Sequence, residues 1–418
     1  MQRDSHDVLV VGGGLVGASL AIALERAGID VGLVDPAPEG ALPEVFDQRN
    51  LSFGEATVNA LRALGVLQRL RVAPAPIRRV HVTRRGDFGR VVLDAADHGR
   101  DAFGQVVVAR DFGEALASRL NDATGVTRYR PARFVADAGL DAGRRQVRIA
   151  GAAGARTIHA RLLVAADGTT SNVRDALGIG VDRHDYGQVL VVGRVRLTRA
   201  PDGTAWERFG PHGPTALLPR GDGYHGVVHG VPAEDADAVA ALDEAGWLAR
   251  LQAAMGWRAG RFLQAGPRSA YPMAKVVARR TLAPRAVLVG NAAQTLHPVG
   301  AQGFNLGLRD ALALVDVIDA GRHGAAMARD VADDGAFDCG ATTLLEAWEQ
   351  RRAEDRARTL AFSDGLARLT SNTSSVAGSL RSLGLLGLAA SPTAQAALVG
   401  GAMGYRGDTP PLARGQGQ

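Results

Sequence analysis

The stretch DVLVVGGGLVGASLAIALERAGIDVGLVD (7–35) constrains the fold of this 418-residue chain more than any other part of it. Its apolar ends predict two strands, and the residues between them predict a glycine turn followed by a helix. Gly12 permits the tight turn, Gly14 lets the backbone approach a pyrophosphate, and Gly17 lets the helix pack closely on the strand. Asp35, at the end of the second strand, can accept hydrogen bonds from a ribose. The stretch therefore predicts a dinucleotide site, with FAD or NAD favoured over NADP.

A second pattern of strand, acid, glycine and helix occurs at RLLVAADGTTSNVRDALG (161–178). Asp167 follows the predicted buried strand, and Ser171 and Arg174 lie in the first turns of the predicted helix. The acid either caps this helix or approaches the same dinucleotide from a second side. The sequence leaves both interpretations open.

A third stretch, VLVGNAAQTLHPVGAQGFNLGLRDA (287–311), leads from a strand through small residues into a long helix. Asn291 can hydrogen-bond a sugar-alcohol hydroxyl, and Pro298 fixes the backbone without an N–H group. A helix that starts near Gly303 presents an N-terminus, which stabilises negative charge. Because a reduced isoalloxazine ring carries such charge, the three stretches together predict bound FAD.

The order of these segments predicts an α/β fold. We expect a Rossmann-like FAD-binding domain of the glutathione-reductase type, interleaved with an antiparallel-sheet substrate domain and followed by C-terminal helices. The expected FAD-binding parts are residues 1–76, 100–185 and 276–340; the expected substrate parts are a hairpin at 77–99 and a sheet at 186–275; residues 341–418 are expected to be helical with a disordered tail. Apolar spacing also predicts helices over 51–70 and 234–255.

Composition narrows the possible partners and the compartment. The chain carries 48 Lys and Arg against 43 Asp and Glu, a net charge of +5, and Lys275 is its only lysine. Because the arginines are scattered among acids, no nucleic-acid partner is expected. The single cysteine, Cys339, excludes an internal disulfide and favours a reducing compartment. Since the N-terminus shows no signal-peptide pattern, we expect a cytoplasmic protein.

The segment LGLLGLAASPTAQAALVGGAMGY (383–405) is uncharged and about long enough to span a bilayer. Pro392 and several glycines interrupt it, so we expect two short helices rather than a span. Arg381 and Arg406 bracket the segment, which leaves open a peripheral contact with the inner face of an anionic membrane.

The three motifs, in this order and spacing, resemble the FAD-dependent aromatic monooxygenases of the 4-hydroxybenzoate hydroxylase superfamily. Within it the chain is similar to the ubiquinone-biosynthesis hydroxylases, above all to the 2-polyprenyl-6-methoxyphenol hydroxylases. The finer likeness rests on FDQRNLSF (46–53), FGQVVVARDFGEAL (103–116), ERFGPHGPTALLP (207–219), RSAYPMA (268–274) and GNAAQTLHPVGAQGFNLGLRDA (290–311).

The resemblance implies a set of FAD contacts. Gly12, Gly14 and Gly17 match positions that contact the pyrophosphate, Asp167 matches a second pyrophosphate position, and Asp35 matches the position that contacts the adenosine ribose. Arg49, Gln105 and Arg110 match positions that contact the ribityl–pyrophosphate part. The positions beside the isoalloxazine are matched by Pro298, Gly303, Phe304 and Asn305. The chain departs from the superfamily at Asn291, where aspartate is usual. An amide can still bond the ribityl chain, but it lacks the negative charge and so can change the flavin's reduction potential.

The resemblance further implies that NAD(P)H reduces FAD, that O₂ then forms a C4a-hydroperoxyflavin, and that a polyprenylated phenol is hydroxylated. His297 is a candidate for a hydrogen bond or proton relay to the phenol, and a structural role fits it equally well. Tyr271 and His225 are candidates to line the substrate pocket, although packing roles are common for such residues. An arginine clamp for a substrate carboxylate is not evident, and Arg220 is the lone candidate.

Several alternatives fit the same motifs. They are hydroxylation at another ring position of the same pathway, reduction of a prenyl double bond, and a flavin-binding scaffold without turnover. A flavin-dependent halogenase is disfavoured because its Trp-x-Trp-x-Ile-Pro motif is absent. Beyond the phenol and O₂, the resemblance implies other ubiquinone-biosynthesis enzymes and a membrane surface as candidate partners.

Overall fold

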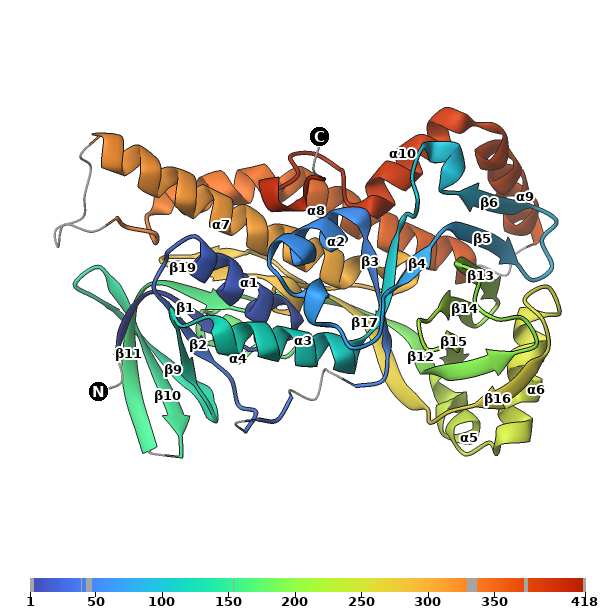
Figure 1. Ribbon diagram of the computed structural model, residues 1–418, viewed down its shortest axis with the longest axis horizontal. Helices are drawn as coiled ribbons and strands as arrows, with labels where there is room; N and C mark the ends of the chain where they lie inside the picture. Colours follow the sequence, from blue (N-terminus) through green and yellow to red (C-terminus); the bar gives the residue numbers. More distant parts are fainter. Residues whose placement is uncertain are drawn as a thin grey trace.

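One half of the molecule is built on a parallel sheet (Figure 1). Its strands lie in the order β8 (Val126–Tyr129), β2 (Val31–Val34), β1 (Ser5–Val11), β11 (Gly154–Ala165) and β19 (Ala286–Leu288), and β18 (Leu282–Ala283) adds an antiparallel edge. This order confirms the predicted Rossmann-like sheet. The computed structural model describes residues 4–38, 40–42, 47–152, 154–328, 337–371 and 375–415.

Two different layers cover this sheet. Helices α1 (Leu15–Arg26), α2 (Glu55–Ala63), α3 (Ala109–Asp122) and α7 (Gln302–Ala328) pack on one face, and strands β9 (Ala132–Asp141) and β10 (Arg144–Gly151) with helix α4 (Asn172–Ala176) pack on the other. Side chains alternate along β1, so Val8 and Val10 face the helices whereas Leu9 and Val11 face β9 and β10. The fold is therefore of the predicted glutathione-reductase type.

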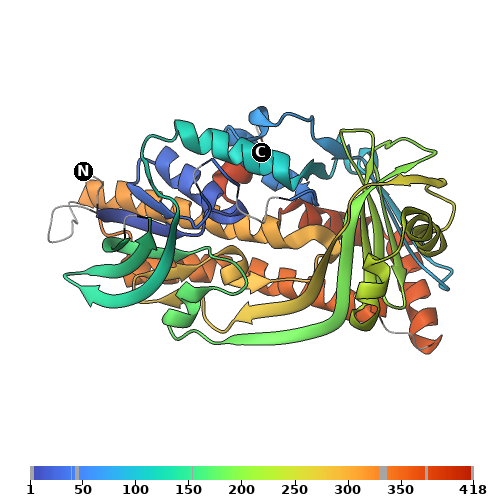
Figure 2. The same ribbon diagram turned by 90° about the horizontal axis from the view of Figure 1, so that it is seen from below.

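The other half is a second, mainly antiparallel sheet. Its order is β20 (Gln294–Thr295), β17 (Ser269–Ala278), β12 (Val181–Leu197), β15 (His225–Pro232), β14 (Gly213–Pro219), β13 (Thr204–Gly210), β5 (Arg79–Arg84) and β6 (Arg90–Asp94), with β16 (Phe262–Ala265) beside β12. Figure 2 shows β12 and β17 running from the nucleotide half into this sheet. Helices α5 (Ala236–Ala240) and α6 (Glu244–Met255) cover its outer face, where Trp247 is fully buried.

Two helix predictions need correction. The predicted helix at 51–70 is shortened to α2, because Asn50–Gly54 forms strand β3, which pairs with β7 (Gly104–Val108) in a small sheet completed by β4 (Ala75–Ile77). The predicted helix at 234–255 is divided into α5 and α6, because Asp243 caps α6 by accepting a hydrogen bond from the backbone N–H of Gly246.

The C-terminal region consists of α8 (Thr342–Ser371), α9 (Ser375–Ala390) and α10 (Pro392–Met403). α9 and α10 are the two short helices expected at the uncharged segment. Among the described helices none is by itself apolar and long enough to cross a membrane, and Gly378–Ala390 with Pro392–Met403 pass that test only as a pair bent by 93°.

The prediction of a disordered tail is wrong for residues 406–415. The carbonyl oxygen of Ala413, a residue only 1% exposed, accepts a hydrogen bond from Asn59. Asp408 forms an ion pair with Arg351 of α8 at 2.7 Å. Apolar burial and one ion pair thus hold the tail against α2 and α8, which composition alone could not reveal. Residues 416–418 lie outside the described residues.

Candidate flavin site

The turn between β1 and α1 has no room for side chains. Gly12 has a φ of +109°, and a Cβ atom there would overlap the carbonyl oxygen of Ala166. A Cβ atom at Gly17 would overlap the carbonyl oxygen of Gly12, so the helix packs on the turn only because both residues are glycine. Gly14 is the N-cap residue of α1. The first N–H groups of α1 therefore open at this turn, an arrangement that binds phosphate.

Asp35 lies directly beside the turn. The residue is 4% exposed, and its carboxylate accepts hydrogen bonds from the backbone N–H groups of Gly13 at 2.7 Å and Ala37 at 2.8 Å. A small cavity of about 20 Å³ adjoins it, lined in part by Leu116 and Arg130. The structure thus brings together the glycine turn and the acid that the sequence paired.

Asp167 caps α4. Its carboxylate accepts hydrogen bonds from the Ser171 hydroxyl and from the backbone N–H of Val173 at 3.1 Å. Arg174 donates to the carbonyl oxygens of Thr169 at 3.1 Å and Ala292 at 3.2 Å, which ties this loop to the start of the third motif. Asp167 therefore supports the first turn of α4 beside the N-cap residue Ser171, in a loop adjoining the third motif, and its predicted contact with the pyrophosphate stays a prediction.

The N-terminal ends of α1 and α7 meet beside the end of β19. Gly290 has a φ of +57°, and a Cβ atom there would lie 3.0 Å from Val16 of α1. A Cβ atom at Gly307 of α7 would lie 3.0 Å from the Cα of Gly290. Because both glycines are needed for this close approach, two positive helix ends lie close together, which favours an anionic ligand.

The residues predicted beside an isoalloxazine divide into two groups. Pro298 is exposed, as is Asn291, the predicted ribityl contact, and a Cβ atom at Gly303 would have no neighbour within 4 Å. Asn305, in contrast, is 3% exposed and is fastened to β3: its amide nitrogen donates to Ser52 at 3.0 Å and its oxygen accepts from Gly54 at 3.0 Å.

Phe304 also positions α7. Its ring lies 5.3 Å from that of Phe53 and 5.6 Å from that of Phe112, measured between centroids. Phe304 and Asn305 thus hold the start of α7 against β3, and Gly303 faces open space.

Arg49 and Tyr271 form one cluster with Asp47. The guanidinium of Arg49 bonds the Asp47 carboxylate through two nitrogens, at 2.9 and 2.8 Å, and lies 4.2 Å from the centre of the Tyr271 ring. The Tyr271 hydroxyl donates to the same carboxylate. Burial would raise the pKa of Asp47, but the bonds from Arg49 and Tyr271 outweigh it and keep that pKa below its usual value. Asp47 was not predicted from the sequence, although it stands two positions before Arg49 within a quoted stretch.

The other two predicted ribityl–pyrophosphate contacts lie near this cluster. Gln105 of β7 pairs with Phe53, and its buried side-chain oxygen has no hydrogen-bond partner among the described atoms. Arg110 lies in the first turn of α3 with a side chain that is 62% exposed, and its backbone N–H donates to the carbonyl oxygen of Asp47 at 2.8 Å. An open polar oxygen and an exposed guanidinium are suited to bind a ribityl–pyrophosphate chain.

Arg220 is not free to clamp a carboxylate. The residue is 5% exposed, and its guanidinium bonds Asp222 at 2.7 Å and the side-chain oxygen of Asn50 at 2.9 Å. A pocket of about 340 Å³ adjoins it and is also lined by Gln48 and Arg110. Arg49 and Arg220 are therefore each neutralised by a nearby aspartate.

His297 is a neutral, buried histidine. It is 2% exposed, and burial lowers its pKa to about 4. Its Nδ1 accepts the backbone N–H of Val299 at 3.2 Å, and Nε2 lies 3.5 Å from the side-chain oxygen of Gln188. These contacts fix the turn that leads into α7, so the geometry favours the structural role over a proton relay.

His225 and Glu207 lie on opposite faces of the second sheet. His225 is 3% exposed and shares a face with Val227, which packs in the cluster under α6. Its neighbour Gly226 faces Asn50 of β3, so His225 points away from the flavin half and serves packing. The strand register places Glu207 on the same face of the sheet as Gly226. Burial raises the pKa of the Glu207 carboxyl to about 7. It is a titratable group on the inner face that the sequence did not single out.

Residues 5–331 match the model of a protein family described as an FAD binding domain. The chain belongs to this family. It is 33% identical over 383 residues to ubiquinone hydroxylase UbiL of Rhodospirillum rubrum, covering 91% of this chain and 85% of the relative. It is 32% identical over 329 residues to the 3-demethoxyubiquinol 3-hydroxylase of Escherichia coli, covering 76% and 81%.

The fold is also similar to that of p-nitrophenol 4-monooxygenase PnpA from Pseudomonas putida DLL-E4. The TM-score is 0.75 with 18% identity, covering 97% of this chain and all of that one. The chain is therefore an FAD-dependent monooxygenase of the ubiquinone-biosynthesis hydroxylase family, with NAD(P)H as co-substrate. The glycine turn, the unpaired oxygen of Gln105 and the open space at Gly303 all fit FAD.

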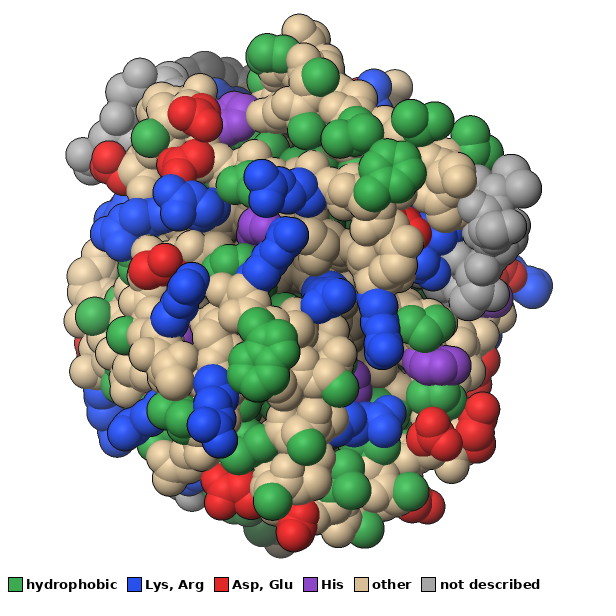
Figure 3. Space-filling model, turned by 90° about the vertical axis from the view of Figure 1, so that its right-hand side faces the viewer, with side chains coloured by type: hydrophobic (Ala, Val, Ile, Leu, Met, Phe, Trp, Pro, Cys, Tyr) green, Lys and Arg blue, Asp and Glu red, His purple; other side chains and the backbone are tan. Residues whose placement is uncertain are grey.

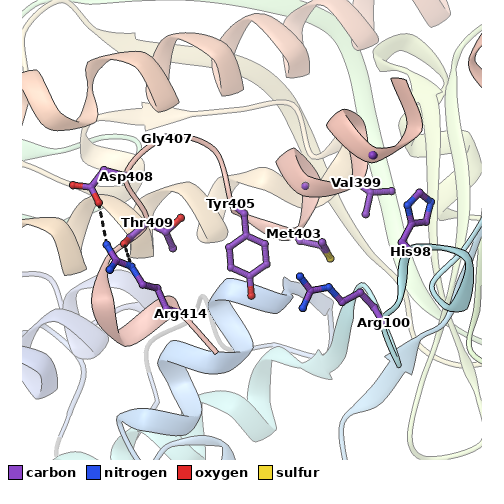
Figure 4. A pocket seen from close by; sticks show the side chains of 11 residues that line it. His98, Arg100, Val399, Met403, Tyr405, Gly407, Asp408, Thr409 and Arg414 are labelled. Carbon is purple, nitrogen blue, oxygen red and sulfur yellow. Dashed lines mark hydrogen bonds and ion pairs between the residues drawn. The ribbon is translucent and has the colours of Figure 1, made fainter. Parts of the chain in front are cut away.

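A further cavity lies elsewhere in the described structure. It measures about 500 Å³ and is lined by α10, the loop at His98 and the C-terminal segment. In Figure 4 the side chain of Arg100 points towards Tyr405, whose ring centre lies 5.9 Å from the guanidinium, and Arg414 points towards Asp408. It contains none of the predicted site residues, and the segment once expected to be disordered forms one of its walls.

Proposed function

We propose that this enzyme hydroxylates a polyprenylated phenol, converting 2-polyprenyl-6-methoxyphenol to 2-polyprenyl-6-methoxy-1,4-benzoquinol. The observation that carries the proposal is the neutralised state of the arginines beside β3. Arg49 is held by Asp47 and Arg220 by Asp222, so neither offers a free charge to a benzoate carboxylate. A decarboxylated phenol needs no such charge.

Each named residue has a task in this proposal. Gly12, Gly14 and Gly17 hold the pyrophosphate, and Asp35 holds the adenosine ribose. Arg49, Gln105, Arg110 and Asn291 bind the chain between the pyrophosphate and the ring, and Pro298 and Gly303 lie beside the ring. FAD, when bound, supplies electron transfer from NAD(P)H to O₂. Tyr271 lines the substrate side, and its hydroxyl donates a hydrogen bond to Asp47, which holds the Arg49 guanidinium in place.

His297 and Asp167 act indirectly in this proposal. His297 shapes the turn before α7 through its bond from Val299, and Asp167 shapes the loop before α4. Neither needs to exchange a proton with the substrate.

The second candidate is hydroxylation at another ring position. It is favoured by the Escherichia coli relative, whose name assigns it to position 3 of a demethoxyubiquinol. The two activities can be separated by complementation. The chain would be expressed in bacterial strains that each lack one ring-hydroxylation step, and the quinones would be measured by mass spectrometry. Restored ubiquinone only in the strain blocked at 2-polyprenyl-6-methoxyphenol supports the proposal. Restoration only in another strain moves the ring position, and restoration in none favours a scaffold.

A further inference from the structure

One end of the molecule carries arginines and exposed apolar side chains together. It comprises the turn between β5 and β6, the neighbouring end of β13, the segment after α6, and the outer side of α9. Figure 3 shows this end: Arg or Lys and apolar side chains are interspersed across the middle of the face, and acidic side chains lie towards its margins. We call this surface the end face.

The end face has an uncompensated positive charge. Arg85, Arg90 and Arg258 are exposed and Arg208 is half-buried, and none of the four forms an ion pair with a carboxylate of the described residues. Burial, and then the neighbouring charges of Arg85 and Arg258, lower the pKa of Arg208. The nearby acid Asp87 is already occupied, because it pairs with Arg84 and Arg381 in the interior.

Hydrogen bonds to backbone carbonyl oxygens join the segments that carry these arginines. The N–H of Arg85 donates to the carbonyl oxygen of Phe209 at 2.8 Å, and Arg208 donates to the carbonyl oxygen of Met255 at 2.7 Å. The turn, the end of β13 and the end of α6 are therefore one continuous surface.

Large apolar side chains lie on the same surface. Trp257 is 70% exposed and Phe88 is 68% exposed. Phe88 also joins the turn to α9, since its N–H donates to the Ser382 hydroxyl at 3.3 Å. On α9, Leu380 is 64% exposed and Leu383 is 58% exposed, one turn apart on the same side. Aromatic and leucine side chains of this size are expensive to leave in water.

We propose that the end face docks on the surface of an anionic phospholipid bilayer. Arginines beside exposed tryptophan, phenylalanine and leucine match a charged headgroup layer over a hydrocarbon layer. A nucleic acid would satisfy the arginines but would leave the leucines in water, so it fits the surface less well. The proposal goes beyond the hydroxylase activity, and vesicle binding can be measured without substrate or turnover.

The test measures sedimentation of the FAD-loaded full chain with two kinds of vesicle. One kind is pure phosphatidylcholine, and the other also contains ~30% phosphatidylglycerol, which is anionic. We expect binding to the anionic vesicles that weakens as salt is raised from about 0.1 to 0.5 M. The variant Arg85→Ala/Arg258→Ala should bind roughly 25-fold less, about fivefold for each charge removed. The matched control is Arg133→Ala/Arg148→Ala, two exposed arginines of β9 and β10 at the opposite end of the molecule.

Tryptophan fluorescence gives a second readout. Of the four tryptophans, Trp247 and Trp348 are fully buried and Trp257 is the exposed one. A vesicle-induced blue shift that disappears in Trp257→Phe supports the docking mode. Equal binding to both kinds of vesicle, no binding, or an equal loss in the control variant overturns the proposal. Flavin absorbance and melting temperature show whether each variant is folded.

Discussion

The variant Gly303→Ala separates the flavin site from the stability of the fold. Gly303 lies in the first turn of α7, and a Cβ atom there would meet nothing within 4 Å. Without flavin the methyl group therefore has no clash, and alanine is a better helix former than glycine. We expect the free energy of unfolding of the FAD-free protein to stay within about 0.5 kcal/mol of the parent value or to rise slightly.

The same methyl group enters the space in which we place the isoalloxazine. Filling a packed contact typically costs about 1–3 kcal/mol. The dissociation constant of FAD should therefore rise roughly 5- to 150-fold. A stability that is unchanged or higher without FAD, together with a weaker affinity for FAD, indicates that the ligand lies against this residue.

The assay is titration of the FAD-free protein by flavin fluorescence quenching, alongside urea unfolding. The control is Gly365→Ala on α8, another helical glycine whose Cβ would meet nothing within 4 Å. It should bind FAD like the parent. Unchanged FAD affinity in Gly303→Ala would refute the placement of the ring beside α7, and a large loss of stability without FAD would show that the space is not open.

Four further outcomes follow. Asp355→Ala should lower the free energy of unfolding by about 3–5 kcal/mol in urea, because Arg309, 2% exposed, loses its partner at 2.8 Å. Glu207→Gln should exceed the parent in free energy of unfolding by about 1–3 kcal/mol at pH 8 and equal it at about pH 4, as measured in urea. Burial raises the pKa of the Glu207 carboxyl to about 7, so the parent loses stability as this carboxyl loses its proton between about pH 4.5 and pH 7. His297→Gln should keep its flavin and lose less than about tenfold in kcat, whereas a larger loss with full flavin loading would establish a proton relay. Deleting residues 406–418 should lower the free energy of unfolding by about 1–3 kcal/mol, and an unchanged melting curve would contradict the packing of the tail.

The features that local sequence encodes were predicted well. The glycine turn at Gly12 and the acid at Asp35 belong to one short βαβ unit, so spacing alone joins them. The long helix expected to start near Gly303 is likewise confirmed as α7, in which Leu308 and Ile318 are buried. The boundaries of the FAD-binding and substrate parts stay a prediction.

The features that depend on distant contacts were missed. Strand β3 exists because it pairs with β7, about fifty residues later, which overrides the helical spacing of its neighbours. Asp47 and Tyr271 are 224 positions apart, so no local pattern could join them. For His225 the sequence left pocket lining and packing open, because one residue of register decides the side to which a strand residue points.

The most direct test of the central claim is a turnover experiment under ¹⁸O₂. Purified, FAD-loaded protein would receive NAD(P)H and a short-chain 2-prenyl-6-methoxyphenol, and the product would be read by mass spectrometry and NMR. We predict substrate-stimulated NAD(P)H consumption and one ¹⁸O atom in the ring, para to the phenol hydroxyl. NAD(P)H consumption that yields only hydrogen peroxide, or an unlabelled product, would contradict the assignment of this phenol as substrate.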